Sequence, residues 1–294
     1  MGGILVTGGS GQVARALAAT AGRRDLRVVG RPDWDFDRLD TLPGLLETAA
    51  PAMVINAAAH TAVDKAETDA DAAWRANCHA PRLIAEYCAR AGIPLIHIST
   101  DYVFDGTKGA PYVESDPVNP TGVYGASKLV GENAVLATGA RAIILRTSWV
   151  YAAEGKNFVR TMLGLAATRR QLRVVADQRG CPTAAQDLAG AILRIADSIL
   201  ASGWQDRYRG VTHAAGSGDT TWHGLAVAAF AEAAQRGLAP PEVTPIATAD
   251  YPTAARRPAD SRLDCARLGR VFGIALPQWR NGLQRTIKFM HWAP

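Results

Sequence analysis

Short apolar segments alternate with amphipathic segments through the first half of the chain. The apolar segments are rich in β-branched residues and cover 3–7, 26–30, 53–57, 94–99 and 142–147. The segments between them have the spacing of amphipathic helices and cover 12–21, 42–50, 67–91 and 124–137. This repeated order of strand and helix predicts an α/β fold with a doubly wound parallel sheet and helices on both of its faces.

The pattern changes after about residue 151. Helical segments then dominate, with further predicted strands at 172–176 and 210–215. We predict that residues 1–150 form the sheet domain and that 172–205 return to it. We assign 151–171 and 206–294 to a smaller, mixed α/β domain that binds the substrate.

The composition excludes several classes of protein. Apolar residues make up 48% and charged residues 20% of the 294 positions, as in a globular protein with a large core. No uncharged apolar run reaches the roughly 18 residues that span a bilayer, and the N-terminus lacks the basic start of a signal peptide. We therefore expect no membrane partner and a cytoplasmic location.

Charge and cysteine spacing narrow the possible partners further. The net charge of +5 is spread along the chain without a basic block, which argues against binding to nucleic acid. The four cysteines form no C-x-x-C pair, so we expect reduced thiols and no metal bound through them.

A glycine-rich turn follows the first predicted strand and opens the first predicted helix. In "VTGGSGQVA", Gly8, Gly11 and Ala14 have the spacing G-x-x-G-x-x-A. Glycine allows the backbone to turn tightly and to approach a pyrophosphate, and the helix N-terminus offers free N–H groups to that anion. The sequence of strand, turn and helix favours a Rossmann-like dinucleotide site over an ordinary turn.

The second predicted strand ends at "GRPDWDFD", where the adenosine ribose lies in such a fold. Arg31 at its tip suits a 2′-phosphate and favours NADPH, with an ordinary surface arginine and NADH as the alternatives. Asp35 and Phe36 are candidates to contact the adenine, one as an acceptor and the other as an apolar ring.

Three residues have the order and spacing of a ketone reductase site. Thr100 comes directly after the strand predicted at 94–99, at the carboxyl edge of the sheet, and Tyr124 and Lys128 share one face of the next helix. Tyrosine can give a proton to a developing alkoxide, a nearby ammonium lowers the pKa of the phenol, and a threonine hydroxyl can hold the carbonyl oxygen. Tyrosine and lysine at this spacing are common in ordinary helices, so the prediction depends on all three residues together with the glycine turn.

Longer blocks extend this pattern over nearly the whole chain. They include "NAAAHTAVDKAE", "HISTDYVFDG", "VYGASKLVGE", "RTSWVYA", "DQRGCPT" and "YPTAARRPADSRLD". The blocks resemble the extended short-chain dehydrogenase/reductases and, more narrowly, the dTDP-4-dehydrorhamnose reductase family. The resemblance implies reduction of the C4 ketone of a dTDP-sugar, dTDP-4-dehydro-L-rhamnose, by NADPH or NADH.

The resemblance also implies roles for individual residues. Thr100, Tyr124 and Lys128 would be catalytic, and Tyr124 and Lys128 would also contact the cofactor. The pyrophosphate would lie along Gly8, Gly11, Gln12 and Val13, and the riboses along Ala58, Ala59 and His60. The sugar would lie near Val63, Thr100, Tyr102 and Trp149, and the diphosphate near Arg256 and Arg257. For His60 a place in the core is an equal alternative, and Trp149 could instead fill a seam between domains.

One departure from the family concerns the oligomer. Members of this family can dimerise through a magnesium site made of glutamates, whereas the corresponding regions of this chain contain Ala16, Gln186 and Arg280. A cation in place of a carboxylate does not suit a hard metal ion. We predict no structural magnesium, and a monomer or a homodimer without a metal.

Other functions stay open from the sequence alone. One is a reductase for another nucleotide deoxysugar, of the dihydrostreptose or 6-deoxytalose type. A second is a non-catalytic NADP-binding regulatory subunit, which would tend to lack Tyr124 or Lys128. A third is a dehydratase, which would need a second carboxylate beside Asp101, where Tyr102 stands.

Overall fold

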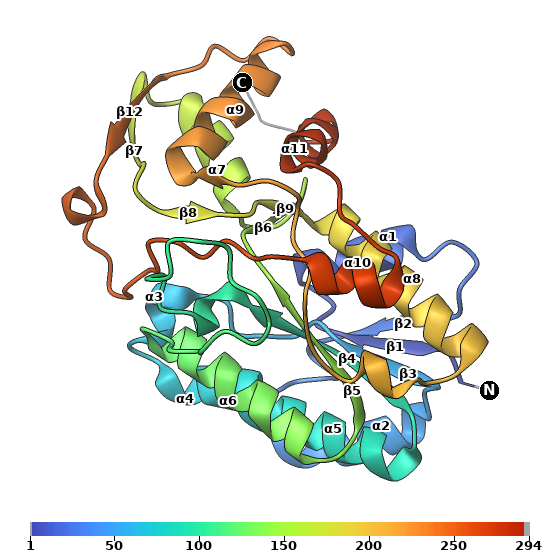
Figure 1. Ribbon diagram of the computed structural model, residues 1–294. Coiled ribbons are helices and arrows are strands. Elements are labelled where there is room, and N and C mark those ends of the chain that lie inside the picture. Colours follow the sequence, from blue (N-terminus) through green and yellow to red (C-terminus); the bar gives the residue numbers. More distant parts are fainter. Residues whose placement is uncertain (1, 291–294) are drawn as a thin grey trace.

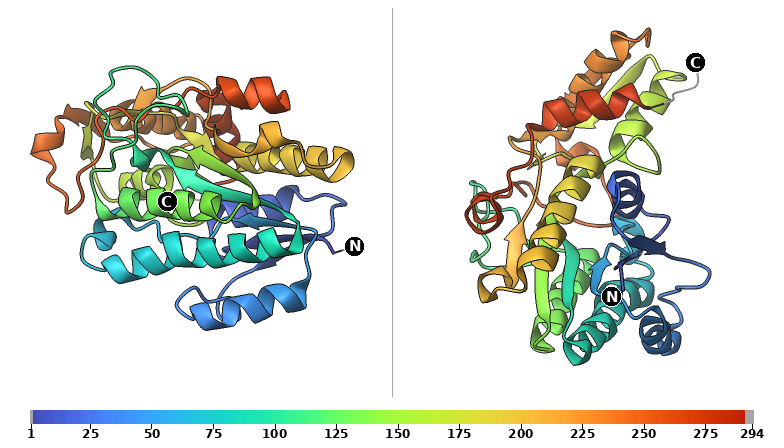
Figure 2. Two further views of the ribbon diagram at one scale, coloured as in Figure 1. Left: turned by 60° about the horizontal axis from the view of Figure 1, so that its bottom comes forward. Right: turned by 90° about the vertical axis from the view of Figure 1, so that its right-hand side faces the viewer.

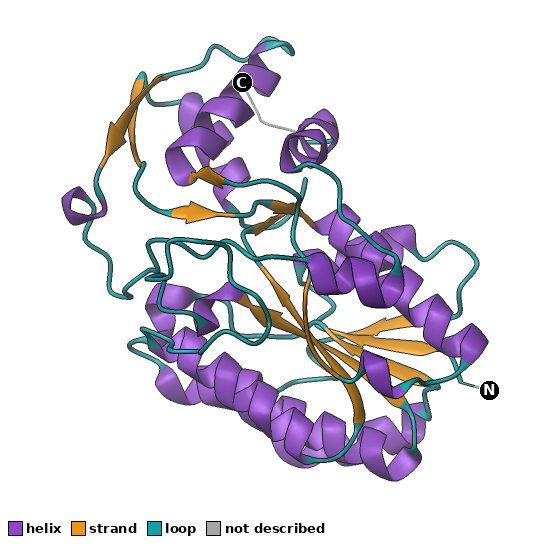
Figure 3. Cartoon of the chain, viewed as in Figure 1, coloured by secondary structure: helices purple, strands orange, loops and turns teal. Residues whose placement is uncertain are grey.

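The computed structural model describes residues 2–290, and its centre is a six-stranded sheet (Figures 1 and 3). All neighbouring strands pair in parallel. Their order across the sheet is β10 (Gly210–His213), β5 (Arg141–Thr147), β4 (Pro94–Thr100), β3 (Met53–Asn56), β1 (Ile4–Thr7) and β2 (Leu26–Val29). The chain therefore reverses its direction of travel across the sheet between β1 and β3, which is the place where such folds bind ligands.

Helices cover both faces of this sheet. One face carries α1 (Gln12–Thr20), α8 (Ala185–Ser202) and α10 (Ala266–Phe272), and the other carries α2 (Leu42–Ala49), α5 (Ala80–Ala91) and α6 (Val123–Ala137). Successive side chains of a strand point to opposite faces, so Val6 packs with the first set of helices and Leu5 with the second. Burial on both sides explains why the strands read as uninterrupted apolar runs, and the predicted α/β fold is confirmed.

A second lobe lies at one end of the molecule (Figure 2). Its core packs α7 (Phe158–Ala166), α9 (Trp222–Ala234) and α11 (Trp279–Lys288) together. Three two-stranded sheets complete this part of the chain. They pair β7 (Gln171–Val175) with β12 (Glu242–Ile246), β6 (Val150–Tyr151) with β9 (Thr183–Ala184), and β8 (Arg179–Gly180) with β11 (Thr220–Thr221).

The structure distributes some segments differently from the division predicted above. The strand predicted at 172–176 pairs with β12 in the second lobe, whereas β10, which was assigned to that lobe, is the edge strand of the six-stranded sheet. The helix predicted at 67–91 consists of α4 (Ala70–Trp74), a π-helical turn (Arg75–His79) and α5, and a short helix, α3 (Val63–Ala66), precedes it. Apolar periodicity predicts a strand or a helix but does not identify its partner.

Helix α6 lies unusually close to neighbouring backbone. A Cβ on Gly131 would lie 1.9 Å from the carbonyl oxygen of Asn77, and one on Gly125 would lie 2.2 Å from that of Tyr102. Only glycine fits at these two points, so the glycines let the helix that carries Tyr124 and Lys128 pack directly on the backbone at Asn77 and Tyr102.

We predict that Gly131→Ala lowers the free energy of unfolding by about 1–3 kcal/mol, because the added methyl group overlaps rigid backbone. Gly190→Ala in α8 is the matched control, since a Cβ there would meet nothing within 4 Å. That control should raise stability by about 0.5–1 kcal/mol, as alanine favours helix more than glycine does. Urea denaturation of the two variants checks this, and equal effects would contradict the account of α6.

Candidate functional site

A cavity of about 780 Å³ opens at the carboxyl ends of β1, β3, β4 and β5. The sheet domain supplies one wall, and Trp149, Asn157 and Trp222 supply part of the other. The size suits a small-molecule site, and its place at the strand reversal is the one expected for a nucleotide in this fold.

The glycine turn forms a close backbone cradle at one end of the cavity. Gly8 has a φ of +91°, and a Cβ there would lie 2.8 Å from the nitrogen of Ala58. A Cβ on Gly30 would lie 2.8 Å from the nitrogen of Gly9. Gly11 caps α1 without a side-chain hydrogen bond, so the N–H groups of the first turn are available to an anion. These features fit the pyrophosphate of a dinucleotide.

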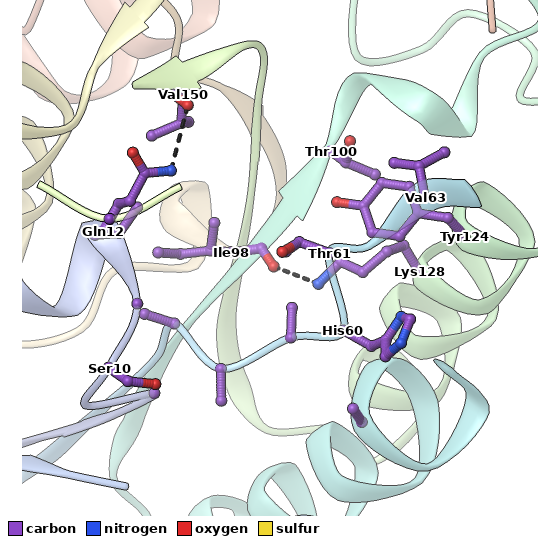
Figure 4. A pocket seen from close by; sticks show the side chains of 18 of the residues that line it. Ser10, Gln12, His60, Thr61, Val63, Ile98, Thr100, Tyr124, Lys128 and Val150 are labelled. Carbon is purple, nitrogen blue, oxygen red and sulfur yellow. Dashed lines mark hydrogen bonds between the residues drawn. The ribbon is translucent and has the colours of Figure 1, made fainter. Parts of the chain in front are cut away.

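Gln12 joins this cradle to the second lobe. Its Nε2 donates to the carbonyl oxygen of Val150 at 3.5 Å (Figure 4), and its Oε1 accepts from Nδ2 of Asn157 at 2.9 Å. Asn157 also caps α7, where its side chain accepts from the backbone N–H of Arg160. The two lobes therefore meet directly at the predicted pyrophosphate position.

A cluster of charges stands at the adenosine end. Arg31 lines the cavity and makes ion pairs with Asp35 and Asp37, and Nε of Arg75 lies 3.2 Å from Asp37. Phe36 lines the cavity and packs into the core, whereas Asp35 is outside the lining. Hydrogen bonds from the backbone N–H of Asp37 and from the guanidinium of Arg31 hold the pKa of Asp35 below its usual range. The carboxylate of Asp35 is therefore bonded to Arg31 in this structure.

Tyr124 and Thr100 lie side by side in the lining of the cavity (Figure 4). Both side chains are buried, and the ring of Tyr102 packs edge-on against Tyr124 with 5.5 Å between centroids. Burial raises the pKa of Tyr124 to about 12, while a hydrogen bond with Thr100 opposes the rise. This differs from the lowered pKa expected from Lys128, and it leaves Tyr124 a protonated phenol near neutral pH.

Lys128 lies under the cavity floor with 1% of its surface exposed. Its Nζ donates to the carbonyl oxygen of Ile98 at 2.6 Å (Figure 4). Burial lowers the pKa of Lys128 to about 8, and the negative charge of Glu132 partly opposes this. Near neutral pH, Lys128 is therefore much closer to losing its proton than a surface lysine is.

Asp101 is a buried carboxylate beside these residues that the motif pattern did not place in the site. It follows Thr100 in a 3₁₀ turn (Asp101–Val103) and lines the cavity. The hydroxyl of Thr100 donates to its Oδ1 at 3.1 Å, and that of Ser148 donates to its Oδ2 at 2.9 Å. Burial raises the pKa of Asp101 to about 6, although these hydroxyls favour the carboxylate.

Two tryptophans form the wall opposite the sheet domain. Trp149, in the left-handed region with a φ of +46°, stacks on Trp222 with centroids 3.5 Å apart and planes 5° apart. Gly180 makes this possible, because a Cβ there would lie 2.4 Å from the Trp149 ring. Trp222 is fixed in turn by a hydrogen bond from Nε1 to Gln178. Nothing in the local sequence around Trp222 indicates this partnership.

The structure brings most of the predicted site residues into one cavity. The lining includes Gly8, Gly11, Gln12, Val13, Arg31, Phe36, Ala58, Ala59, His60, Val63, Thr100, Tyr102, Tyr124, Lys128 and Trp149. Three predicted residues lie outside it, namely Asp35, Arg256 and Arg257. Arg257 makes an ion pair with Asp64 at 2.7 Å, and Arg256 is exposed.

Within residues 2–290, no group of three or more His, Cys, Asp and Glu side chains could hold a metal ion. In the same part of the chain, no helix has the length and apolarity needed to cross a membrane.

The raised pKa of Asp101 predicts a pH dependence of stability. A carboxyl whose folded pKa is above its unfolded pKa stabilises the protein below about pH 4 and loses that contribution as the pH rises through about 6. Relative to Asp101→Asn, the wild type should therefore lose about 2–3 kcal/mol of unfolding free energy between pH 4 and pH 7. Urea denaturation at several pH values measures this difference.

Asp105→Asn is the control of opposite sign. Backbone and side-chain hydrogen bonds from Thr107 lower the pKa of Asp105 to about 2, so its contribution should be lost as the pH falls below about 4. Parallel curves for the wild type and Asp101→Asn would contradict the account of Asp101.

Comparison with known proteins gives the family. A family model described as the RmlD substrate binding domain matches residues 1–291. The dTDP-4-dehydrorhamnose reductase of Sinorhizobium fredii is 46% identical over 97% of this chain and 96% of its own length, and that of Burkholderia thailandensis is 46% identical over 97% and 98%.

Solved structures agree with these relatives. The dTDP-4-dehydrorhamnose reductase from Bacillus anthracis, in complex with NADP, is 31% identical with a TM-score of 0.89, over 98% of this chain and 99% of that one. The one from Clostridium acetobutylicum is 36% identical with a TM-score of 0.88, over 97% and 98%. The chain belongs to the dTDP-4-dehydrorhamnose reductase family.

Proposed function

We propose that this protein reduces the C4 ketone of dTDP-4-dehydro-L-rhamnose to the alcohol of dTDP-L-rhamnose, with NADPH as the reductant and NADH as a possible substitute. The observation that carries the proposal is the cavity that holds Thr100, Tyr124 and Lys128 beside a glycine cradle. Family membership supplies the substrate class.

The nicotinamide cofactor supplies a hydride when it is bound. The residues of the chain hold the ketone and provide the proton. Tyr124 is a neutral phenol near pH 7 and gives its proton to the carbonyl oxygen as negative charge develops there. Thr100 orients the same oxygen by turning its hydroxyl proton from Asp101 toward it, and both groups act in a buried site where charge interactions are strong.

Lys128 stabilises the phenolate that remains after proton transfer. The hydrogen bond from Nζ to Ile98 fixes the ammonium under the cavity floor, and its positive charge favours the ionised tyrosine. Because this charge is buried, the same group titrates at a pH at which a surface lysine would remain charged.

The sugar is proposed to bind between the catalytic residues and the tryptophan wall. Val63, Tyr102, Trp149 and Trp222 line this part of the cavity, where the two tryptophan rings stack on each other. A flat apolar ring suits the face of a deoxysugar. The roles of Arg256 and Arg257 at the diphosphate stay predictions, since both lie outside the lining.

The alternatives fit the site less well. A non-catalytic subunit has no need of a buried tyrosine, lysine and threonine at one cavity. A dehydratase would need a second carboxylate next to Asp101, where the Tyr102 ring instead packs on Tyr124. The dTDP-glucose 4,6-dehydratase of Bacillus anthracis shares the fold at 16% identity, and that likeness concerns the fold alone. A reductase for another deoxysugar is the remaining alternative, and the names of the relatives favour rhamnose.

We predict that Tyr124→Phe lowers kcat by about 10²–10⁴-fold, because the ring stays in place and the proton donor is lost. The assay follows NADPH absorbance with enzymatically made dTDP-4-dehydro-L-rhamnose. Tyr87→Phe is the matched control, since Tyr87 lies on α5, packs in the core beside α2 and does not line the cavity. Near wild-type turnover by Tyr124→Phe would contradict the mechanism.

The charges at the adenosine end predict a change in cofactor preference. Asp37 holds Arg31 and Arg75 and places negative charge where a 2′-phosphate would bind. Asp37→Asn should therefore tighten NADP⁺ binding by about fivefold without tightening NAD⁺ binding.

Tryptophan fluorescence titration measures both dissociation constants. The control is Asp33→Asn, which removes the same charge from an exposed position outside the cavity lining. An equal gain in NADP⁺ affinity in both variants would show a general charge effect rather than a local one.

We also propose that any homodimer forms without magnesium, because Ala16, Gln186 and Arg280 replace the expected carboxylates. The mass in solution, measured by light scattering, should be the same with and without EDTA. A dimer that EDTA dissociates would refute this.

A further inference from the structure

A chain of buried polar side chains runs from the central strands to Lys128. Thr7 on β1, Asn56 on β3 and His97 on β4 have at most 1% of their surface exposed. The Thr7 hydroxyl donates to Oδ1 of Asn56 at 2.6 Å, Nδ2 of Asn56 lies 3.0 Å from Nδ1 of His97, and Nε2 of His97 lies 3.4 Å from Nζ of Lys128. Thr7, Asn56 and His97 have no role in the mechanism proposed above.

The hydrogen-bond donors around Asn56 determine which nitrogen of His97 carries the proton. The backbone N–H of Ala58 points at Asn56 from 3.3 Å, and because an N–H can only donate, the Asn56 atom that it faces is the oxygen. The other amide atom is then the NH₂ group, which can only donate to His97. Nδ1 of His97 must therefore accept, and the single proton of the neutral ring lies on Nε2.

This arrangement presents an N–H group to the Lys128 nitrogen. An ammonium has three donors and no acceptor, so it cannot accept from Nε2–H, whereas a neutral amine can accept through its lone pair. A cationic His97 would still present Nε2–H to Lys128, and its second proton, on Nδ1, would face the NH₂ group of Asn56. The depressed pKa of His97, caused by burial and by the charge of Lys128, is consistent with a ring that stays neutral.

We propose that the Thr7–Asn56–His97 chain is a positioning device for the reaction: by holding the Nε2–H tautomer of His97 against Nζ, it weakens the ammonium form of Lys128 and sets the pH at which the lysine loses its proton. The inference rests on the proposed function for its consequence, because the ammonium is the form that assists Tyr124. It adds His97 and Asn56 to the residues that control turnover, although neither lines the cavity.

Other charged groups act on Lys128 as well. On α6, Glu132 favours the ammonium and Tyr124 is neutral near pH 7. The charge of Glu132 is held by Arg146 on β5, with 2.6 Å between Nη2 and Oε2. Asp101 lies beyond the end of β4, where it is hydrogen-bonded to Thr100 and Ser148. The group within hydrogen-bond range that opposes the ammonium is His97, and Ile98 next to it supplies an acceptor.

The tautomer can be read directly from the wild-type protein by ¹⁵N NMR of histidine-labelled protein, with the His97 signal assigned by its loss in His97→Gln. We expect a protonated Nε2 and an unprotonated Nδ1. His213 is an internal reference of the opposite kind, since its Nδ1 faces the carbonyl oxygens of Tyr112 and Asp264 and must carry the proton. A protonated Nδ1 on His97 would overturn the proposal without any substitution in the chain.

Asn56→Asp tests the link to Lys128. The carboxylate still accepts from Thr7 and Ala58, but it requires a proton on Nδ1 of His97, so Nε2 becomes free to accept from the ammonium. We expect the spectrum to show protonated Nδ1, and the alkaline limb of the pH profile of kcat/KM to move up by about one unit. A changed tautomer with an unmoved limb, or a moved limb with an unchanged tautomer, would overturn the proposal.

Failure of the proposed function gives a different result. In that case the wild type does not reduce the ketone, yet the histidine spectrum is still readable. The titration of Lys128 by ¹⁵N NMR of lysine-labelled protein then replaces the pH profile, with the same shift expected in Asn56→Asp. An unshifted lysine would overturn the inference independently of the substrate.

Discussion

The site depends on how α6 packs on β4 and β5. This helix buries two opposite charges, Lys128 and Glu132, against strands that supply matching partners. Lys128 donates to the carbonyl oxygen of Ile98, and Glu132 accepts from Ser99 and from Arg146. A buried ion without its partner is costly, so a shift of the helix by one residue along β4 would be strongly unfavourable. Gly125 and Gly131 let the same helix also pack directly on the backbone of Tyr102 and Asn77.

This packing also determines the chemistry. Tyr124 lies one helical turn before Lys128, so fixing the lysine fixes the tyrosine beside Thr100. Burial then moves the pKa of Tyr124 and Asp101 up and that of Lys128 down, each toward its neutral form. A neutral phenol can donate a proton, and the pKa of the nearby lysine, about 8, is close enough to neutral pH for the lysine to change its charge there. The interactions that hold the helix in register therefore also set the protonation of the catalytic groups.

The sequence was sufficient for features that are local along the chain. Each strand of the first half is buried on both faces and reads as an apolar run, and the glycine turn and the Tyr124–Lys128 spacing depend on a few adjacent residues. The structure brings Thr100, Tyr124 and Lys128 to one cavity, as the order of the elements predicted.

Features that depend on distant partners could not be predicted in this way. The pairing of β7 with β12 joins segments about 70 residues apart, and a strand pattern does not say which strand it will meet. The sequence predicts that Asp35 contacts the adenine, but in the structure its carboxylate accepts a hydrogen bond from Arg31, four positions earlier. The stacking of Trp149 on Trp222 and the contact of His97 with Lys128 likewise arise only when separate elements pack.

The central claim is that a hydride reaches C4 of a keto-sugar in this cavity. The most direct measurement uses NADPH that carries deuterium at the transferable position of the nicotinamide C4, together with dTDP-4-dehydro-L-rhamnose, and locates the label in the product by NMR. The account predicts one deuterium at C4 of dTDP-L-rhamnose. Product without deuterium at C4, or label at another carbon of the sugar, would contradict it.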